Sequence, residues 1–269
     1  MPTVDDQLHG QRMILLVSLL FLVGFLLVAA FRNSFVALDL SVNAWTASIN
    51  KGSFTVVAEG ISVTFDTISL AVISVVLAVV FFVKNQWRYG VLLVGAIGGD
   101  ALLVAILKML IIYPRPLNEI IHATDYSFPS GHVTGSVVFF GILTFFAWKN
   151  WASAKTKAST SGFYAAIIVL VGFDRIYLNV HWFSDVAGGF LLGGFWLMFT
   201  LWVFSLLGNK IKLSRSSGQV LLHSSGSLLR RTMAIGTPIA APTAICVMLP
   251  DGPCPRHQNI ILDKPEPHL

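Results

Sequence analysis

Three short polar stretches interrupt a chain that is otherwise strongly apolar, and they carry residue types suited to phosphate chemistry. They are KMLIIYPRP (108–116), PSGH (129–132) and DRIYLNVHWFSD (174–185). All three lie at the edges of long apolar runs, where cations and imidazoles beside a bilayer are costly and usually functional. Brought together in one pocket, they would form an anion site with a nucleophile and a proton donor.

The first stretch offers two cations, Lys108 and Arg115, seven residues apart. At about 3.6 residues per turn this is almost two helical turns, so both side chains are expected to point the same way. Pro114 and Pro116 are expected to end the helix and stiffen the backbone around Arg115. Basic side chains that snorkel to a membrane interface follow the same pattern, so this stretch alone leaves both interpretations open.

The second stretch opens an apolar run with Ser130, a residue type favoured as a helix N-cap. The backbone N–H groups of Gly131 and His132 would then point outward at the positive end of the helix dipole, where anions bind. Gly131 lets an anion approach the backbone closely. His132, in the first turn, would be placed to donate a proton. An ordinary capped helix start has the same sequence pattern.

The third stretch pairs His181 with Asp185, four residues later. On a helix the two side chains share a face. A carboxylate bonded to one ring nitrogen fixes the tautomer and leaves the other nitrogen free to attack. Arg175 precedes His181 by six residues, close enough to bind the same anion, and Arg suits bidentate phosphate binding. A purely structural His–Asp pair is the alternative.

Taken together, the stretches supply three cations, a nucleophile and an acid. Phosphoryl transfer needs charge stabilisation on the equatorial oxygens and in-line attack. This set supplies both without a metal or another cofactor.

The order of these residues resembles the type 2 phosphatidic acid phosphatase superfamily. The shared pattern is Lys, six residues, Arg-Pro; then PSGH; then Arg, five residues, His, three residues, Asp. The resemblance covers roughly residues 13–207. The membrane branch of this superfamily includes phosphatidylglycerophosphatase B and undecaprenyl pyrophosphate phosphatases. The resemblance implies an all-α membrane protein of six transmembrane helices, with the helical core of acid phosphatases and vanadium haloperoxidases.

The resemblance also implies a role for each motif residue. His181 would form a phosphohistidine intermediate, Asp185 would orient it, and His132 would protonate the leaving group. The phosphate would be held by Lys108, Arg115, Arg175, Ser130 and the backbone N–H of Gly131.

One position departs from the family pattern. Asp174 stands before Arg175, where the family usually has Ser. A Ser could donate to a phosphate oxygen, whereas an ionised Asp would repel it. We expect Asp174 to turn away and pair with Arg175 or a neighbour, or to be protonated. Two further acids, Asp66 and Asp100, are expected to lie outside the site, with Asp100 a candidate for interhelical bonding.

Composition places the chain in a membrane. Its 269 residues are 55% hydrophobic and 12% charged, whereas soluble domains carry about 25% charged residues. The net charge of +5 fits basic cytoplasmic loops better than nucleic-acid binding. Cys246 and Cys254 suggest neither a zinc site nor a disulfide framework.

Six apolar runs approach the about 20 residues that a span requires. They cover residues 13–31, 61–83, 89–112, 132–148, 163–177 and 186–207. Segment 38–60 is expected to lie along the outer interface as a short helix or loop. Residues 1–207 therefore form one membrane domain, and 208–269 are expected to be a largely disordered cytoplasmic tail.

Loop charges predict the orientation. Basic residues lie between spans two and three, between spans four and five, and after span six, which makes that side cytoplasmic. Both termini are then inside, and the three polar stretches face the extracytoplasmic side of the cell membrane.

The sequence predicts an integral membrane lipid phosphatase acting on phosphatidylglycerophosphate, phosphatidic acid or undecaprenyl pyrophosphate. A lipid phosphotransferase with the same intermediate and a non-catalytic transporter or scaffold that binds lipid phosphate remain open. A soluble-type vanadate peroxidase is the most distant alternative.

Overall fold

A computed structural model of the chain describes residues 4–49, 52–117 and 119–207. Over these ranges every regular element is a helix, and no strand is present. The predicted tail, 208–269, lies outside the described residues.

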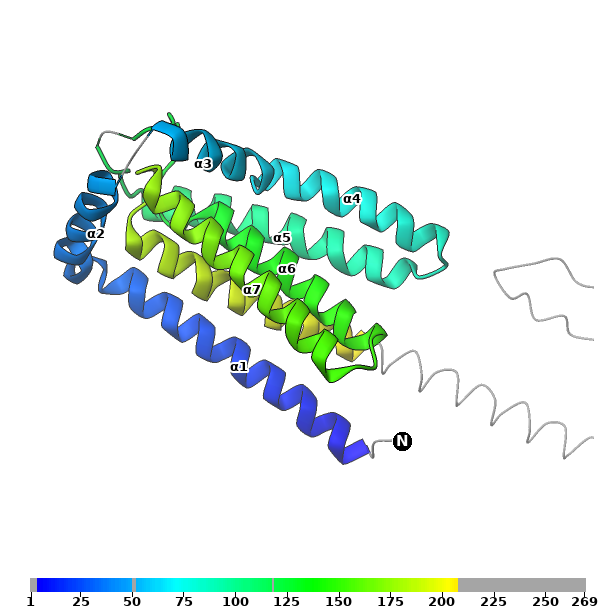
Figure 1. Cartoon of the computed structure of the whole chain (residues 1–269). Helices are drawn as coiled ribbons and strands as arrows, with labels where there is room; N and C mark the ends of the chain where they lie inside the picture. The colour runs from blue at the N-terminus through cyan, green and yellow to red at the C-terminus, as the bar shows by residue number, and fades with distance from the viewer. Residues whose placement is uncertain (1–3, 50–51, 118, 208–269) are drawn as a thin grey trace, which may run out of the picture. The chain divides into compact units, whose positions relative to one another are not determined.

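Eight elements and one further helix follow in chain order over the described residues, and Figure 1 labels α1 to α7. They are α1 (Val4–Ala30), η1 (Arg32–Phe35), α2 (Val36–Ile49), α3 (Gly52–Thr64), α4 (Thr67–Val83), α5 (Trp87–Ile111), α6 (Gly131–Asn150) and α7 (Ala154–Tyr177), then the helix Phe183–Leu207, called here the last helix.

The predicted all-helical membrane fold with six spans is confirmed. Among the described residues, α1, α5, α6, α7 and the last helix are each long and apolar enough to cross a bilayer. The sixth span is a bent pair, α3 and α4, whose axes differ by 49°. α7 begins at Ala154, earlier than the predicted 163. Its first two turns are polar, so a prediction from apolar run length left them out.

The bend between α3 and α4 falls at Phe65 and Asp66. Asp66 has an extended backbone conformation and its carboxylate accepts the N–H of Ile68 at 3.2 Å, which makes it the N-cap of α4. This cap starts a new helix inside an apolar run. The bend therefore places a carboxylate at a membrane-helix end.

Segment 38–60 forms most of α2 and α3, which are longer helices than predicted. Both pack against α7. In α2, Thr46 donates to the carbonyl of Ile176 at 3.4 Å, and Asn43 donates to the side chain of Asn179 at 2.7 Å. These helices therefore support the turn that follows α7.

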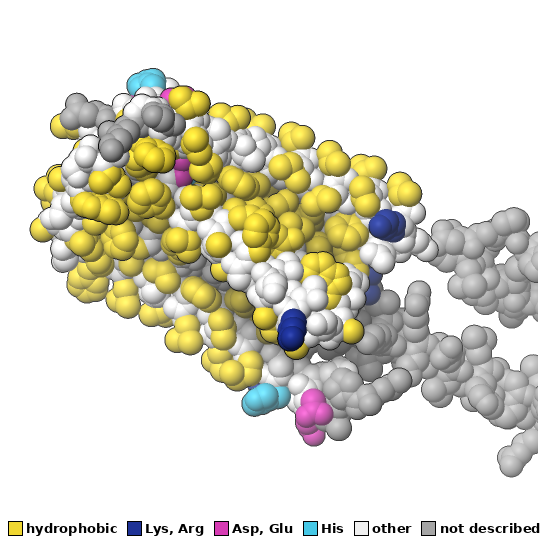
Figure 2. Space-filling view, viewed as in Figure 1, with side chains coloured by type: hydrophobic (Ala, Val, Ile, Leu, Met, Phe, Trp, Pro, Cys, Tyr) yellow, Lys and Arg dark blue, Asp and Glu magenta, His cyan; other side chains and the backbone are white. Residues whose placement is uncertain are grey.

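The main hydrophobic core joins α4, α5, α6 and the last helix. A second buried cluster joins α1, α5, the loop before α6 and the last helix through Phe25, Val104, Phe128 and Leu192. Large apolar side chains also cover the outer flank of the helices (Figure 2), as expected where lipid replaces water.

The two ends of this helical unit differ. The turns between α4 and α5 and between α6 and α7 lie at one end, where the Lys and Arg side chains in view gather (Figures 1 and 2). α2, the start of α3 and the loop 112–130 lie at the other end. The end of α5 and the starts of α6 and the last helix meet there, so the three polar stretches converge.

Candidate active site

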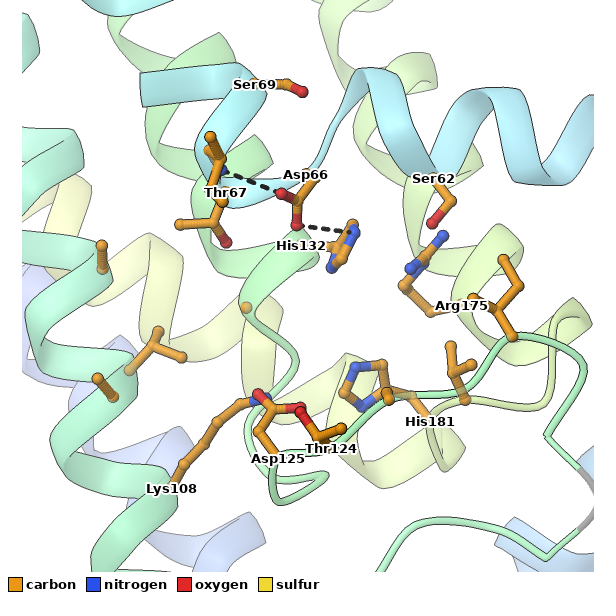
Figure 3. Close-up of a pocket in the computed structure, with 18 of the residues that line it drawn as sticks. Ser62, Asp66, Thr67, Ser69, Lys108, Thr124, Asp125, His132, Arg175 and His181 are labelled. Carbon is orange, nitrogen blue, oxygen red and sulfur yellow. Dashed lines mark hydrogen bonds and ion pairs between the residues drawn. The ribbon is translucent and has the colours of Figure 1, made fainter. Parts of the chain in front are cut away.

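A cavity of about 680 Å³ opens at the end where the polar stretches meet. Six of the predicted site residues line it: Lys108, Arg115, Gly131, His132, Arg175 and His181. Figure 3 shows the two imidazoles, Lys108 and Arg175 around this space, with Asp66 and Asp125 among them. The other two predicted residues, Ser130 and Asp185, lie behind the cavity wall.

His181 and Asp185 form the predicted pair, although not as two residues of one helix. The last helix begins at Phe183, so His181 lies in the turn before it. Nδ1 of His181 is 3.3 Å from Oδ2 of Asp185, and the same oxygen accepts the N–H of Trp182 at 2.8 Å. This leaves Nε2 directed to the cavity side, 3.5 Å from a nitrogen of Arg115.

The charge state of His181 suits a nucleophile. Burial lowers its pKa to about 4, helped by the nearby cations of Arg115 and Lys108, while Asp185 acts in the opposite direction. Only 2% of the residue is exposed. The imidazole is therefore neutral at pH 7, with a lone pair available on the nitrogen that carries no proton.

The first cation pair converges by a different route from the predicted one. α5 ends at Ile111, and Ile112 adopts a left-handed conformation with φ 45°, so Arg115 is not on the helix of Lys108. Arg115 instead donates to the carbonyls of Val180 at 2.6 Å and Asp125 at 2.8 Å. These bonds hold its guanidinium beside the turn that carries His181.

Asp125 joins the two cations, and sequence reasoning missed it. Its carboxylate forms ion pairs with both Lys108 and Arg115. Burial alone would raise the pKa of Asp125, but hydrogen bonds and charge from Lys108 and Arg115 outweigh it and lower the pKa to about 2. The side chain is 57% exposed. A partly exposed carboxylate thus lies against both of the cations that were predicted to bind phosphate.

The start of α6 meets the cavity as predicted, with one difference. Ser130 is the N-cap by position, but its hydroxyl makes no capping bond and has no hydrogen-bond partner among the described residues. Its N–H donates to the carbonyl of Asp185 at 3.2 Å, which ties α6 to the last helix. Gly131 and His132 line the cavity, so the positive end of α6 faces it.

His132 faces a carboxylate that was expected outside the site. Its Nε2 is 3.5 Å from Oδ1 of Asp66, the N-cap at the bend between α3 and α4 (Figure 3). The sequence Asp66-Thr67 before an apolar run is a helix-start signal, but nothing local indicates that this acid contacts His132. Asp100 also lines the cavity, although only 3% of it is exposed.

Asp174 forms the expected pair with Arg175. The Nε of Arg175 donates to Oδ2 of Asp174 at 3.0 Å, and an NH2 group of the same guanidinium contacts that oxygen. Arg175 lines the catalytic cavity, whereas Asp174 lines a separate apolar groove between α3 and α7. The carboxylate is therefore turned away from the cavity that Arg175 lines, as expected.

Comparison with known proteins identifies the family of the chain. The sequence pattern of the PAP2 superfamily matches residues 89–208. Phosphatidylglycerophosphatase B of Bacillus subtilis is 32% identical over 178 residues, which cover 65% of this chain and 87% of that protein. The chain belongs to the PAP2 superfamily.

Two further comparisons agree with this assignment. Undecaprenyl-diphosphatase of Sulfolobus acidocaldarius is 40% identical over 80 residues, 28% of this chain and 32% of that protein. The crystal structure of a transmembrane PAP2-type phosphatidylglycerolphosphate phosphatase from Bacillus subtilis superimposes with a TM-score of 0.62 at 29% identity, covering 68% of this chain and 94% of that one.

Proposed function

We propose that this protein is an integral membrane phosphatase that removes phosphate from a lipid phosphate or pyrophosphate through a phosphohistidine intermediate. One observation carries the proposal. Nε2 of a neutral, Asp185-bound His181 faces a cavity that Lys108, Arg115 and Arg175 also line. A nucleophile surrounded by cations fits a phosphoryl group, whose transition state needs positioning and charge stabilisation.

The reaction has two balanced steps. Nε2 of His181 attacks phosphorus, the bond from phosphorus to the leaving oxygen breaks, and His132 protonates that oxygen. A water molecule then attacks the phosphohistidine, giving a proton to His132 as the phosphorus–nitrogen bond breaks. Inorganic phosphate leaves and both imidazoles return to their starting states.

Each remaining motif residue has a place in these steps. Lys108, Arg115 and Arg175 neutralise the phosphate oxygens, and the N–H of Gly131 adds the positive end of α6. Ser130 is buried and does not line the cavity, so a contact between its hydroxyl and phosphate requires a movement at the start of α6. The carboxylate of Asp185 balances the charge that develops on His181.

A membrane lipid fits the surroundings of the cavity. Its wall includes Ile68, Ala101, Val104 and Ala105, apolar residues of α4 and α5. A lipid tail would lie against this wall with its head group at the cations. Trp182 and Phe183, which follow His181 in the sequence, do not line the cavity, and the indole of Trp182 donates to the carbonyl of Pro114 at 2.9 Å.

The proposed orientation puts this cavity at the extracytoplasmic face of the cell membrane. Arg88, Lys149 and Lys157 belong to the opposite end of the helices. Lys and Arg concentrate in cytoplasmic loops of membrane proteins. The substrate candidates are therefore lipids of the outer leaflet, with phosphatidylglycerophosphate, phosphatidic acid and undecaprenyl pyrophosphate as the first three.

The test is phosphate release from these three lipids by the purified protein in detergent with EDTA. We expect release to continue in EDTA, because protein cations provide the charge stabilisation, and to be lost in His181→Ala. His9→Ala, on the exposed surface of α1, is the matched histidine control. Full activity of His181→Ala, or no release of phosphate from any of the three lipids, would contradict the proposal. Adding an acceptor lipid distinguishes hydrolysis from transfer.

A further inference from the structure

A buried cation lies behind the active site and comes from a distant part of the chain. Arg32 is the first residue of η1, directly after α1, and is only 4% exposed. Its NH2 group forms an ion pair with Oδ1 of Asp185 and donates to the hydroxyl of Ser184 at 3.4 Å. Arg32 lies outside residues 89–208, the part of the chain that matches the family pattern.

Aromatic rings surround the rest of this guanidinium. Its central carbon is 3.5 Å from the ring centroid of Tyr113 and 4.1 Å from that of Phe128. Its Nε and NH1 groups have no hydrogen-bond partner among the described residues. Ring faces attract a cation, but they do not replace the hydrogen bonds of water. The polar contacts of Arg32 are therefore concentrated on Asp185 and Ser184.

The two oxygens of Asp185 have separate partners. Oδ1 accepts a hydrogen bond from Arg32. Oδ2 accepts the N–H of Trp182 and lies near Nδ1 of His181. The carboxylate is completely buried. Rotation of this group away from its plane would break contacts on both oxygens, so Arg32 holds the carboxylate in the orientation in which it meets the imidazole.

The same N-terminal segment also anchors the start of the last helix. Asp39 of α2 accepts the N–H of Ser184 at 2.8 Å and its hydroxyl at 2.7 Å. Burial raises the pKa of Asp39, while the bonds from Ser184 act in the opposite direction. Asp39 therefore holds the backbone next to Asp185 without Arg32. A substitution of Arg32 should change the position of the Asp185 carboxylate more than the position of the last helix.

We propose that Arg32 is a positioning residue for the nucleophile, holding the Asp185 carboxylate charged and aimed at Nδ1 of His181. Breaking a buried ion pair by removing one partner leaves an uncompensated charge, which moves or takes up a proton. The imidazole then loses its fixed tautomer just when phosphorylation of Nε2 requires a compensating anion. The inference rests on the proposed role of His181.

The kinetic test compares Arg32→Met and Arg32→Lys with the parent protein, with inorganic phosphate release from lipid phosphate as the assay. We expect Arg32→Met to lower kcat by about 10- to 100-fold, by analogy with the loss of a partner that orients a metal-binding imidazole. KM should stay unchanged because Arg32 does not line the cavity. Arg32→Lys, which keeps the charge, should recover part of the loss. Arg88→Met is the control, since Arg88 also lies over an aromatic ring but starts α5 at the opposite end.

A double-mutant comparison separates positioning from a general loss of structure. In an Asp185→Asn background, Arg32→Met should lower kcat no further, because its effect passes through Asp185. An equal fall in both backgrounds, or a normal kcat in Arg32→Met, would overturn the inference.

A measurement that needs no turnover keeps this test separate from the proposed function. Nuclear magnetic resonance of isotope-labelled histidine reports the tautomer of His181 in the intact protein. We expect the Nδ1–H tautomer in the parent protein and a mixture in Arg32→Met. An unchanged tautomer contradicts the role of Arg32, whereas an inert parent protein or an active His181→Ala contradicts the proposed function.

Discussion

Each cation or imidazole of the proposed site lies beside a carboxylate. Asp125 pairs with Lys108 and Arg115, Asp174 with Arg175, and Asp66 with His132. These acids differ in what they do next. Asp174 lines another groove, whereas Asp125 pairs with the two cations that we propose bind the phosphate.

Asp125 is expected to compete with substrate. Asp125→Asn removes the internal anion from Lys108 and Arg115, so KM for a lipid phosphate should fall by about two- to fivefold, the range of a half-exposed ion pair. Michaelis–Menten kinetics in detergent measure this. Glu119→Gln is the control, because it changes the same charge in the same loop, where Glu119 pairs with His122. A raised KM in Asp125→Asn would instead make Asp125 part of substrate binding.

The pH dependence should follow the neutral state of His181. Because burial lowers its pKa to about 4, Nε2 keeps its lone pair above that pH and loses it below. Protonation of His181 should therefore not slow phosphohistidine formation above about pH 5. Below that pH the rate should fall, with half of it lost near pH 4. Rapid-quench kinetics as a function of pH test this. Half-loss from His181 near its ordinary pKa of about 6.5 would contradict a buried, neutral nucleophile.

Asp66 is expected to assist the general acid. Asp66→Asn removes the negative charge beside His132 but keeps an N-cap for α4, since Asn caps as well as Asp. We expect about a tenfold lower kcat for substrates with a poor leaving group, such as a lipid alcohol, and little change for a nitrophenyl ester. Comparing the two substrates measures this. An equal fall for both would point to a structural role.

At the scale of helices, apolar run length predicted the six spans, because each segment needs about 20 apolar residues to cross the bilayer. The positions of helix ends were less predictable. Ile112 ends α5 in a left-handed conformation that its residue type disfavours, so the helical spacing of Lys108 and Arg115 was the wrong reason for their convergence. The only sequence signal for the bend at Asp66 was its residue type, which favours a helix N-cap.

Close helix contacts hold the last helix against the site. A Cβ added to Gly188 would lie 2.4 Å from the ring of Phe128, which is fully buried beside Arg32. Gly188→Ala should therefore destabilise the protein by about 1–3 kcal/mol through overpacking. Gly98→Ala, where nothing lies within 4 Å of the added atom, should leave stability equal or slightly higher. Thermal unfolding midpoints in detergent test the pair, and equal midpoints would contradict the packing.

At the scale of the whole molecule, charge and apolar surface support the orientation that we propose in the membrane. Apolar side chains cover the flank of the helices that is in view, and the basic turns lie at the end opposite the cavity-lining residues (Figures 1 and 2). The motif residues of the site were predictable because their types and spacing are local. Arg32, Asp125 and Asp66 were not, because their roles depend on contacts between distant segments.

The orientation predicts which end a membrane-impermeant thiol reagent reaches in intact cells. In a background with Cys246→Ser and Cys254→Ser, Leu117→Cys in the exposed loop at the cavity end should react from outside. Asn85→Cys, in the turn between α4 and α5, should react only after the membrane is permeabilised. The reverse pattern would place the cavity at the cytoplasmic face.

The most direct measurement of the central claim is to trap the intermediate. Parent protein is mixed with a radiolabelled lipid phosphate, quenched in alkali within milliseconds, and the labelled peptide is identified. We expect an acid-labile phosphate on His181 that forms before free phosphate is released. The label should be absent in His181→Ala. Turnover with label on another residue, or undiminished release by His181→Ala, would contradict it.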